Sequence, residues 1–125
     1  MQIADTSFLY ALFSRSDAFH GKARKAATAA DSILVPSEIY SETVSLIHYR
    51  VGFAAAKSAG AWMRAQKRLQ VASCSQSLSD GVWEIFRAAQ GGLSYPDAVV
   101  LAWCRERRAR PLAFDQAILR RVKRS

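Results

Sequence analysis

The sequence is poor in cysteine, proline and glycine, with two, three and six of them in 125 residues. The two cysteines, Cys74 and Cys104, form no CxxC pair and have no histidine at metal-ligand spacing. This pattern argues against a disulfide framework and against a zinc site. Because half of the residues are hydrophobic, the composition is typical of a folded chain rather than a disordered one. The length fits one domain, so we expect residues 1–125 to form a single core.

The sequence also lacks a long hydrophobic run. The longest uncharged stretch, residues 69–79, is too short and too polar to cross a bilayer. Near the N-terminus, Asp5 interrupts the segment that would be apolar in a signal peptide. We therefore expect neither secretion nor membrane insertion, and a reducing cytoplasm fits the cysteine content best.

Acidic residues are outnumbered, with 10 Asp and Glu against 18 Lys and Arg, for a formal net charge of +8. Such an excess attracts polyanions and makes their binding depend on salt. Nucleic acid is the first partner that this charge suggests. A basic protein that binds an acidic protein is the alternative, and composition does not separate the two.

Short apolar runs alternate with longer helical patterns along the chain, which predicts the α/β class with a central parallel sheet and crossover helices. The predicted strands are residues 1–4, 33–35, 69–72 and 111–114, the last as an inner strand. After a first helix carrying Phe8 to Phe13, the predicted helices are residues 17–30, 37–49, 53–68, 78–90, 98–108 and 116–122. Ser37 and Ser94 are the expected N-caps of two of these helices.

Four acids fall at the junctions between these elements. Asp5 and Asp115 directly follow predicted strands, whereas Glu42 and Asp97 lie in the first turns of predicted helices. In a parallel sheet, the carboxyl ends of the strands and the starts of the following helices share one edge, so the four carboxylates can converge there. Converging carboxylates raise one another's pKa unless a cation lies between them. Because oxygen ligands suit hard cations, the pattern predicts a Mg²⁺ or Mn²⁺ site that can hydrolyse a phosphodiester.

Each of these acids also has a purely structural interpretation. Asp5 and Asp115 can serve as N-caps, and Asp97 can interact with the free N–H groups at a helix start. Glu38 lies one turn before Glu42 on the same helix face, so either can be the acid of the site and either can be simply solvated.

Other conspicuous side chains are assigned structural roles. His20 and His48 have no acid at catalytic spacing, so we expect surface or packing roles for both. Trp62, Trp83 and Trp103 lie on different predicted helices, and we expect core or dimer contacts from them rather than base stacking.

Four segments together resemble the four acid-bearing motifs of PIN domains, in the same order. They are Ile3-Ala4-Asp5-Thr6-Ser7-Phe8-Leu9, Pro36 to Ile47 with Glu42, Leu93-Ser94-Tyr95-Pro96-Asp97-Ala98, and Leu112-Ala113-Phe114-Asp115. The match covers nearly the whole chain, and it is most similar to VapC-like toxins of bacterial toxin–antitoxin pairs.

The resemblance implies an α/β/α sandwich around a parallel sheet of about four to five strands. It implies Asp5, Glu42 and Asp97 as the acidic core, Asp115 as the fourth acid, and Thr6 as a supporting hydroxyl. It further implies Mg²⁺- or Mn²⁺-dependent cleavage of RNA by a metal-activated water, inhibition by an antitoxin that inserts a segment into the acidic groove, and homodimerisation. The alternative is a non-catalytic PIN module that binds nucleic acid. A phosphatase with Asp5 as nucleophile is disfavoured because no second acid follows two residues later.

Overall fold

A four-stranded parallel sheet forms the centre of the computed structural model, which describes residues 1–124 and the side chains of residues 1–122. The strands are β1 (Gln2–Ala4), β2 (Ile33–Pro36), β3 (Leu69–Ala72) and β4 (Arg110–Leu112). Their order is β3-β2-β1-β4, and all neighbours are parallel. The predicted α/β class with a central parallel sheet is confirmed.

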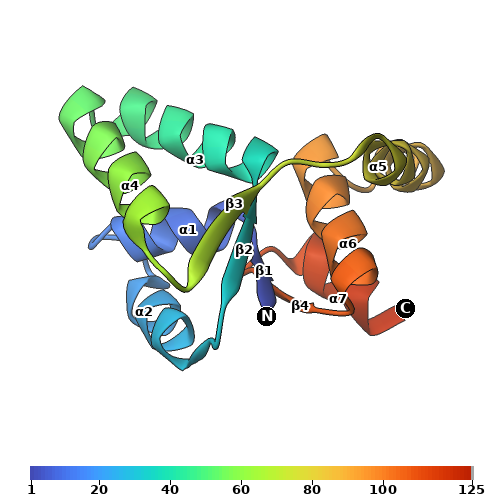
Figure 1. The fold of residues 1–125 in the computed structure, drawn as a ribbon, viewed down its shortest axis with the longest axis horizontal. Coiled ribbons are helices and arrows are strands. Elements are labelled where there is room, and N and C mark those ends of the chain that lie inside the picture. The colour runs from blue at the N-terminus through green and yellow to red at the C-terminus, as the bar shows by residue number, and fades with distance from the viewer. Residues whose placement is uncertain (125) are drawn as a thin grey trace.

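Helices cover both faces of the sheet. They are α1 (Thr6–Phe13), α2 (His20–Ala29), α3 (Ser37–Arg50), α4 (Phe53–Ala65), α5 (Gln76–Ala88), α6 (Tyr95–Arg107) and α7 (Gln116–Arg124). In Figure 1 the helices α1 to α4 lie to the left of the sheet and α5 to α7 lie to the right, which makes three layers. Among the described residues, no helix has both the length and the apolar composition needed to cross a membrane.

The core lies between the central strands and α6. Ile3 and Leu34, which pair across β1 and β2, are completely buried, as expected for strands covered by helices on both faces. In α6, the seven consecutive residues 98–104 are all buried. This explains why the first part of α6 is apolar nearly all round, while its exposed arginines begin at Arg105, near the negative end of the helix dipole.

The position of β4 differs from the prediction. The strand lies at the edge of the sheet, beside β1, and it ends at Leu112 rather than at Phe114. Pro111 lies in the middle of this strand and has no backbone N–H to donate, which is compatible with an edge strand but not with an inner one. The last residues before Asp115 therefore form a loop.

Two helices have a serine as N-cap, and one of the two serines predicted as N-caps is not a cap. Ser94 is the N-cap of α6, where its Oγ accepts a hydrogen bond from Asp97 N at 3.2 Å, as expected. Ser37 is not an N-cap, because the helix already begins there and its Oγ donates to Glu38 Oε1 at 3.0 Å. Ser75 caps α5, so that helix begins at Gln76, earlier than predicted.

The three tryptophans have different environments. Trp103 is buried in the core, as expected, whereas Trp62 and Trp83 are exposed on α4 and α5. These two are therefore not core residues, and the alternative that they make dimer contacts stays a prediction. His20 has a packing role, because its Nδ1 lies 2.7 Å from the carbonyl oxygen of Ala11 and ties α2 to α1.

Candidate active site

The four acids singled out by the sequence line one cavity of about 270 Å³. The cavity lies at the carboxyl end of the sheet, the upper end of β1 and β2 in Figure 1, where α3 and α6 begin. Its walls are formed by Asp5, Thr6, Ser7, Ile39, Glu42, Ser94, Pro96, Asp97 and Asp115. Larger cavities of about 620 and 490 Å³ lie beside α2 and α4, but none of the four acids is among the described residues that line them.

Asp5 is the most buried of these acids, with only 4% of its surface exposed. It is the N-cap of α1, and its Oδ1 accepts hydrogen bonds from Phe8 N at 3.0 Å and from Ser7 Oγ at 2.8 Å. Among the described residues, none donates a hydrogen bond to the second oxygen, Oδ2. One oxygen therefore serves the helix, while the other is available to a ligand.

Burial raises the pKa of Asp5 to about 6. The hydrogen bonds from Phe8 and Ser7 oppose this effect, and repulsion from Asp97 and Asp115 adds to it. A carboxylate that is both buried and repelled by its neighbours is stabilised by a cation placed among them.

Asp97 and Asp115 are partly buried on the other side of the cavity. Burial raises the pKa of Asp97, repulsion from Asp115 raises it further, and hydrogen bonds with Ser94 oppose both effects. Asp115 Oδ1 accepts a hydrogen bond from Ala117 N at 2.7 Å, next to the start of α7. As with Asp5, the carboxylate binds the backbone through one oxygen and still faces the cavity.

Of the two glutamates on α3, only Glu42 lines the cavity. Its side chain is exposed at the rim. Glu38 instead contacts neighbouring side chains, because its Oε1 accepts from Ser37 Oγ at 3.0 Å and its Oε2 accepts from Cys74 Sγ at 3.5 Å. The geometry thus favours Glu42 over Glu38 as the acid of this cavity.

Ser7 has a role that the sequence did not reveal. Its Oγ donates to Asp5 Oδ1 at 2.8 Å and accepts from Phe114 N at 2.9 Å. The hydroxyl thereby joins the first turn of α1 to the loop after β4, which carries Asp115. The only sequence signal is a second hydroxyl residue directly after Thr6, and it does not identify a partner so distant in the chain.

Thr6 lines the cavity with a buried hydroxyl whose Oγ1 has no hydrogen-bond partner among the described residues. An unsatisfied buried hydroxyl costs about 1–3 kcal/mol, so a ligand that engages it stabilises the folded protein. This is the residue expected to support the acids.

The donor set fits a hard divalent cation. Carboxylates and hydroxyls line the cavity, and no histidine or cysteine is among the described residues of its walls. Among the described residues no three acids, histidines or cysteines are close enough to form a ready-made metal cluster. A cation placed among Asp5, Asp97 and Asp115 would relieve their mutual repulsion. The buried Thr6 hydroxyl, which has no hydrogen-bond partner among the described residues, and the buried Asp5 carboxylate both fit such a cation.

Replacing Ser7 by alanine is expected to weaken both the fold and the site. Phe114 N loses its acceptor, so we expect the free energy of unfolding to fall by about 1–3 kcal/mol and the melting temperature by roughly 4–10 °C. The pKa of Asp5 should rise further, because the bond from Ser7 is one of the contacts that lower it. Loss of a contact that positions a metal-binding carboxylate should reduce the affinity of the site for Mg²⁺ about 10–100-fold.

The matched control for this variant is Ser14→Ala, since the Ser14 hydroxyl interacts only at the surface, with Ser16. Thermal denaturation and a titration with Mg²⁺ measure the two effects. A Ser7→Ala protein that melts and binds Mg²⁺ like Ser14→Ala would show that the link between α1 and the loop after β4 is unimportant.

The PIN domain family model matches residues 3–125, so this chain belongs to the PIN domain family. Among solved structures, the chain is similar to VapC20 of Mycobacterium tuberculosis, described as a sarcin–ricin loop cleaving toxin. That alignment covers 96% of this chain and 94% of VapC20, with 28% sequence identity and a TM-score of 0.85.

A toxin–antitoxin complex from Klebsiella pneumoniae shares the fold. It aligns over 92% of this chain and 87% of that one, with 16% identity and a TM-score of 0.68. No curated protein sequence matches this chain. The resemblance to PIN domains and to VapC-like toxins predicted from the sequence is confirmed by these findings.

Proposed function

We propose that this chain is an endoribonuclease that depends on Mg²⁺ or Mn²⁺ and is the toxin of a toxin–antitoxin pair. The observation that carries the proposal is that Asp5, Glu42, Asp97 and Asp115 line one cavity of a PIN domain. Members of this family are nucleases that generally use divalent metal ions. The similarity to VapC20, which is described as an RNA-cleaving toxin, supports RNA as the substrate.

In this proposal, Asp5 and Asp97 are the direct ligands of the cation, because they are the acids most strongly affected by burial and by neighbouring charge. Glu42 and Asp115 complete the ligand shell or hold a second ion, and the Thr6 hydroxyl supplies a further oxygen. When bound, a divalent cation supplies an activated water and neutralises charge on the phosphate. Ser7 keeps Asp5 and the Asp115 loop in register.

The basic surface of the chain would hold the RNA backbone. With a net charge of +8, the protein attracts RNA over a distance and loses affinity as salt rises. The acidic cavity alone would repel a phosphate, so cleavage requires that the cation and the surrounding basic residues outweigh the four carboxylates. Because VapC20 is described as cleaving the sarcin–ricin loop, a structured RNA is the first substrate to test.

An antitoxin is the proposed protein partner. The similarity to a toxin–antitoxin complex supports it at the level of the fold. A basic antitoxin segment would pair with the acidic cavity and exclude both cation and RNA. Homodimerisation and a cytoplasmic location stay predictions, and light scattering of the purified protein measures the first.

The test is cleavage of RNA by the purified chain. We expect fragments in the presence of Mg²⁺ or Mn²⁺, no fragments after addition of EDTA, and recovery when the metal is restored. A generic phosphomonoester should not be hydrolysed. RNA that is bound but stays intact under every metal condition would contradict the nuclease and support a non-catalytic binding module.

A further inference from the structure

A second cavity, of about 360 Å³, opens beside the acidic one. The two share Thr6, Ser7 and Asp115 in their walls, so they are adjacent. The remaining lining residues of the second cavity are Tyr10, Asp17, Phe19, Leu46, Arg50 and Phe114. The second cavity therefore differs from the acidic one in having three aromatic rings and an arginine beside its two aspartates, Asp17 and Asp115.

Aromatic rings form one wall of this second cavity. Phe19 and Phe114 stack with their centroids 4.7 Å apart and an interplanar angle of 12°. Phe19 is 41% exposed, so part of its ring is open to a ligand. Its position is fixed by Asp17, whose Oδ1 accepts a hydrogen bond from Phe19 N at 2.8 Å.

Two cations lie against these rings. The Arg50 guanidinium lies 5.1 Å from the centroid of the Tyr10 ring, and Lys22 Nζ lies 5.6 Å from that of Phe19. Among residues 1–122, neither cation is within salt-bridge distance of a carboxylate. Arg50 and Lys22 are therefore not engaged in ion pairs among these residues and can contact an anionic ligand.

We infer that this second cavity binds one nucleotide of a single-stranded RNA segment, next to the phosphate held at the four acids. The base packs against the wall of Tyr10, Phe19 and Phe114, and its phosphate pairs with Arg50. Aromatic rings combined with cations are the usual means of holding unpaired bases and their backbone. The inference rests on the proposed function for the identity of the neighbouring phosphate, but binding in this cavity can be measured without cleavage.

Charge favours a nucleotide over a protein segment. A peptide that pairs with Arg50 must be acidic, while a peptide that pairs with the adjacent carboxylates must be basic. An RNA strand meets both requirements when a cation accompanies it, because the same phosphodiester chain contacts Arg50 directly and the acids through the cation.

The test measures binding of a fluorescein-labelled, mixed-sequence single-stranded RNA, with every variant built on an Asp5→Asn background that does not cleave. We expect Arg50→Ala to weaken binding about tenfold and to lower the slope of log affinity against log salt by about 0.7, as for one lost phosphate contact on a single strand. Phe19→Ala should also weaken binding about tenfold but leave the salt slope unchanged, because stacking is lost and charge is not. Phe19→Trp should restore the affinity.

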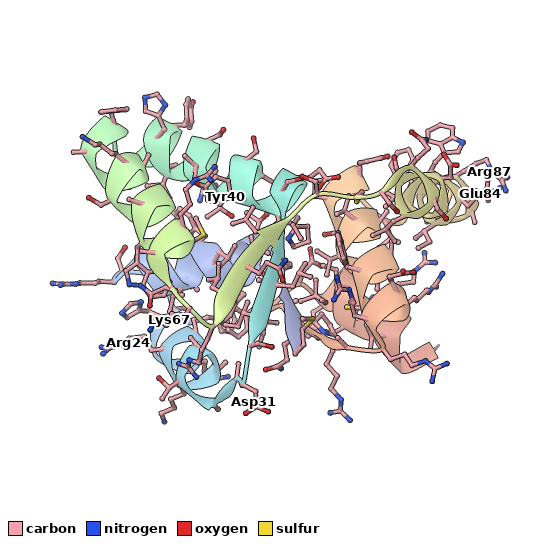
Figure 2. The ribbon with its side chains drawn as sticks, in the orientation of Figure 1. Arg24, Asp31, Tyr40, Lys67, Glu84 and Arg87 are labelled. Carbon is pink, nitrogen blue, oxygen red and sulfur yellow. The ribbon has the colours of Figure 1, made fainter. Side chains whose placement is uncertain are left out.

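Two matched controls separate this cavity from general surface effects. Arg64 lies 4.9 Å from the centroid of Tyr40, a ring contact similar to that of Arg50 with Tyr10, and its Nε also donates to the Tyr40 hydroxyl at 2.9 Å, but it does not line the cavity. Figure 2 shows Tyr40 near α3 and α4. Phe53 is a more exposed phenylalanine, at 67%, and also lies outside the cavity. Arg64→Ala and Phe53→Ala should bind the RNA like the background protein.

Equal affinities for all variants, or no RNA binding by the background protein, would overturn the inference and leave the cavity to a protein partner. Cleavage by the wild-type chain is measured in parallel. If Arg50 and Phe19 determine RNA affinity but the wild-type chain does not cleave, the inference stands and the proposed function fails. If the wild-type chain cleaves RNA and these residues have no effect on RNA affinity, the proposed function stands and the inference fails.

Discussion

Replacing Asp5 by asparagine is expected to abolish RNA cleavage, with a loss of at least about 10³-fold, while the fold stays intact. The change removes a buried negative charge next to Asp97 and Asp115 without altering the size of the side chain. Asparagine is as good an N-cap as aspartate, so its oxygen can keep the bonds from Phe8 N and Ser7 Oγ. The cleavage rate of the purified variant tests the loss of activity, and its melting curve tests whether the fold is intact.

Asp31→Asn is the matched control for this variant. Asp31 is exposed and lies at the opposite end of the sheet, just before β2, at the bottom of Figure 2. It should cleave like the wild-type chain. An Asp5→Asn protein that cuts RNA at the wild-type rate would contradict the assignment of Asp5 as a ligand.

Adding Mg²⁺ or Mn²⁺ to the metal-free protein is expected to raise its melting temperature. A cation present at about 100 times its dissociation constant stabilises the folded state by about 2.7 kcal/mol, equivalent to roughly 10 °C for a chain of this size. The shift should be lost in Asp5→Asn. No shift at millimolar metal in the wild-type chain would favour a non-catalytic binding module.

The pH dependence of this stability follows from the raised pKa of Asp5. In the folded protein this pKa is about 6, against an ordinary value of 3.8 for aspartate, so the folded state holds the proton more tightly than the unfolded state. Its contribution to the stability of the metal-free protein is fully present below about pH 4 and is lost as pH rises through about 6. The loss corresponds to about 3 kcal/mol, and burial of Asp97 acts in the same direction.

Metal should reverse this trend, because a cation binds the ionised carboxylates and competes with their protons. Melting curves between about pH 5 and pH 7.5 should therefore show a metal-free protein that loses stability with rising pH and a metal-induced shift that grows with rising pH. In Asp5→Asn the decline of the metal-free curve should be much smaller. A metal shift that is the same across this range would show that Asp5 does not take part in binding.

The positions of the acids could be predicted from the sequence because they are fixed by local patterns. Asp5 follows a short apolar run, and Asp97 follows the Ser94 cap, so each is placed at the end or start of an element without knowledge of the rest. The rule that strand ends and helix starts share one edge then brings them together. The two interpretations offered for Asp5 and Asp115 are compatible, because each carboxylate caps the backbone through Oδ1 alone.

Features that depend on packing could not be predicted in this way. The edge position of β4 is set by which strand pairs with β1, and an apolar run does not specify its neighbour. The contact of Ser7 with Phe114 and the stacking of Phe19 on Phe114 join opposite parts of the sequence. Likewise, the exposure of Trp62 and Trp83 depends on which side of each helix meets the sheet, and single tryptophans do not reveal it.

The pairing of β1 with β4, reinforced by Ser7 and Phe114, has a consequence for synthesis of the chain. Asp5 is synthesised before the other three acids of the cavity and Asp115 after them. The whole segment from Asp5 to Asp115 must therefore be synthesised before the opposite walls of the cavity can meet. Products that stop short of Leu112 carry Asp5, Glu42 and Asp97 but have neither β4 nor the last acid, so premature termination yields a fragment without a complete set of ligands.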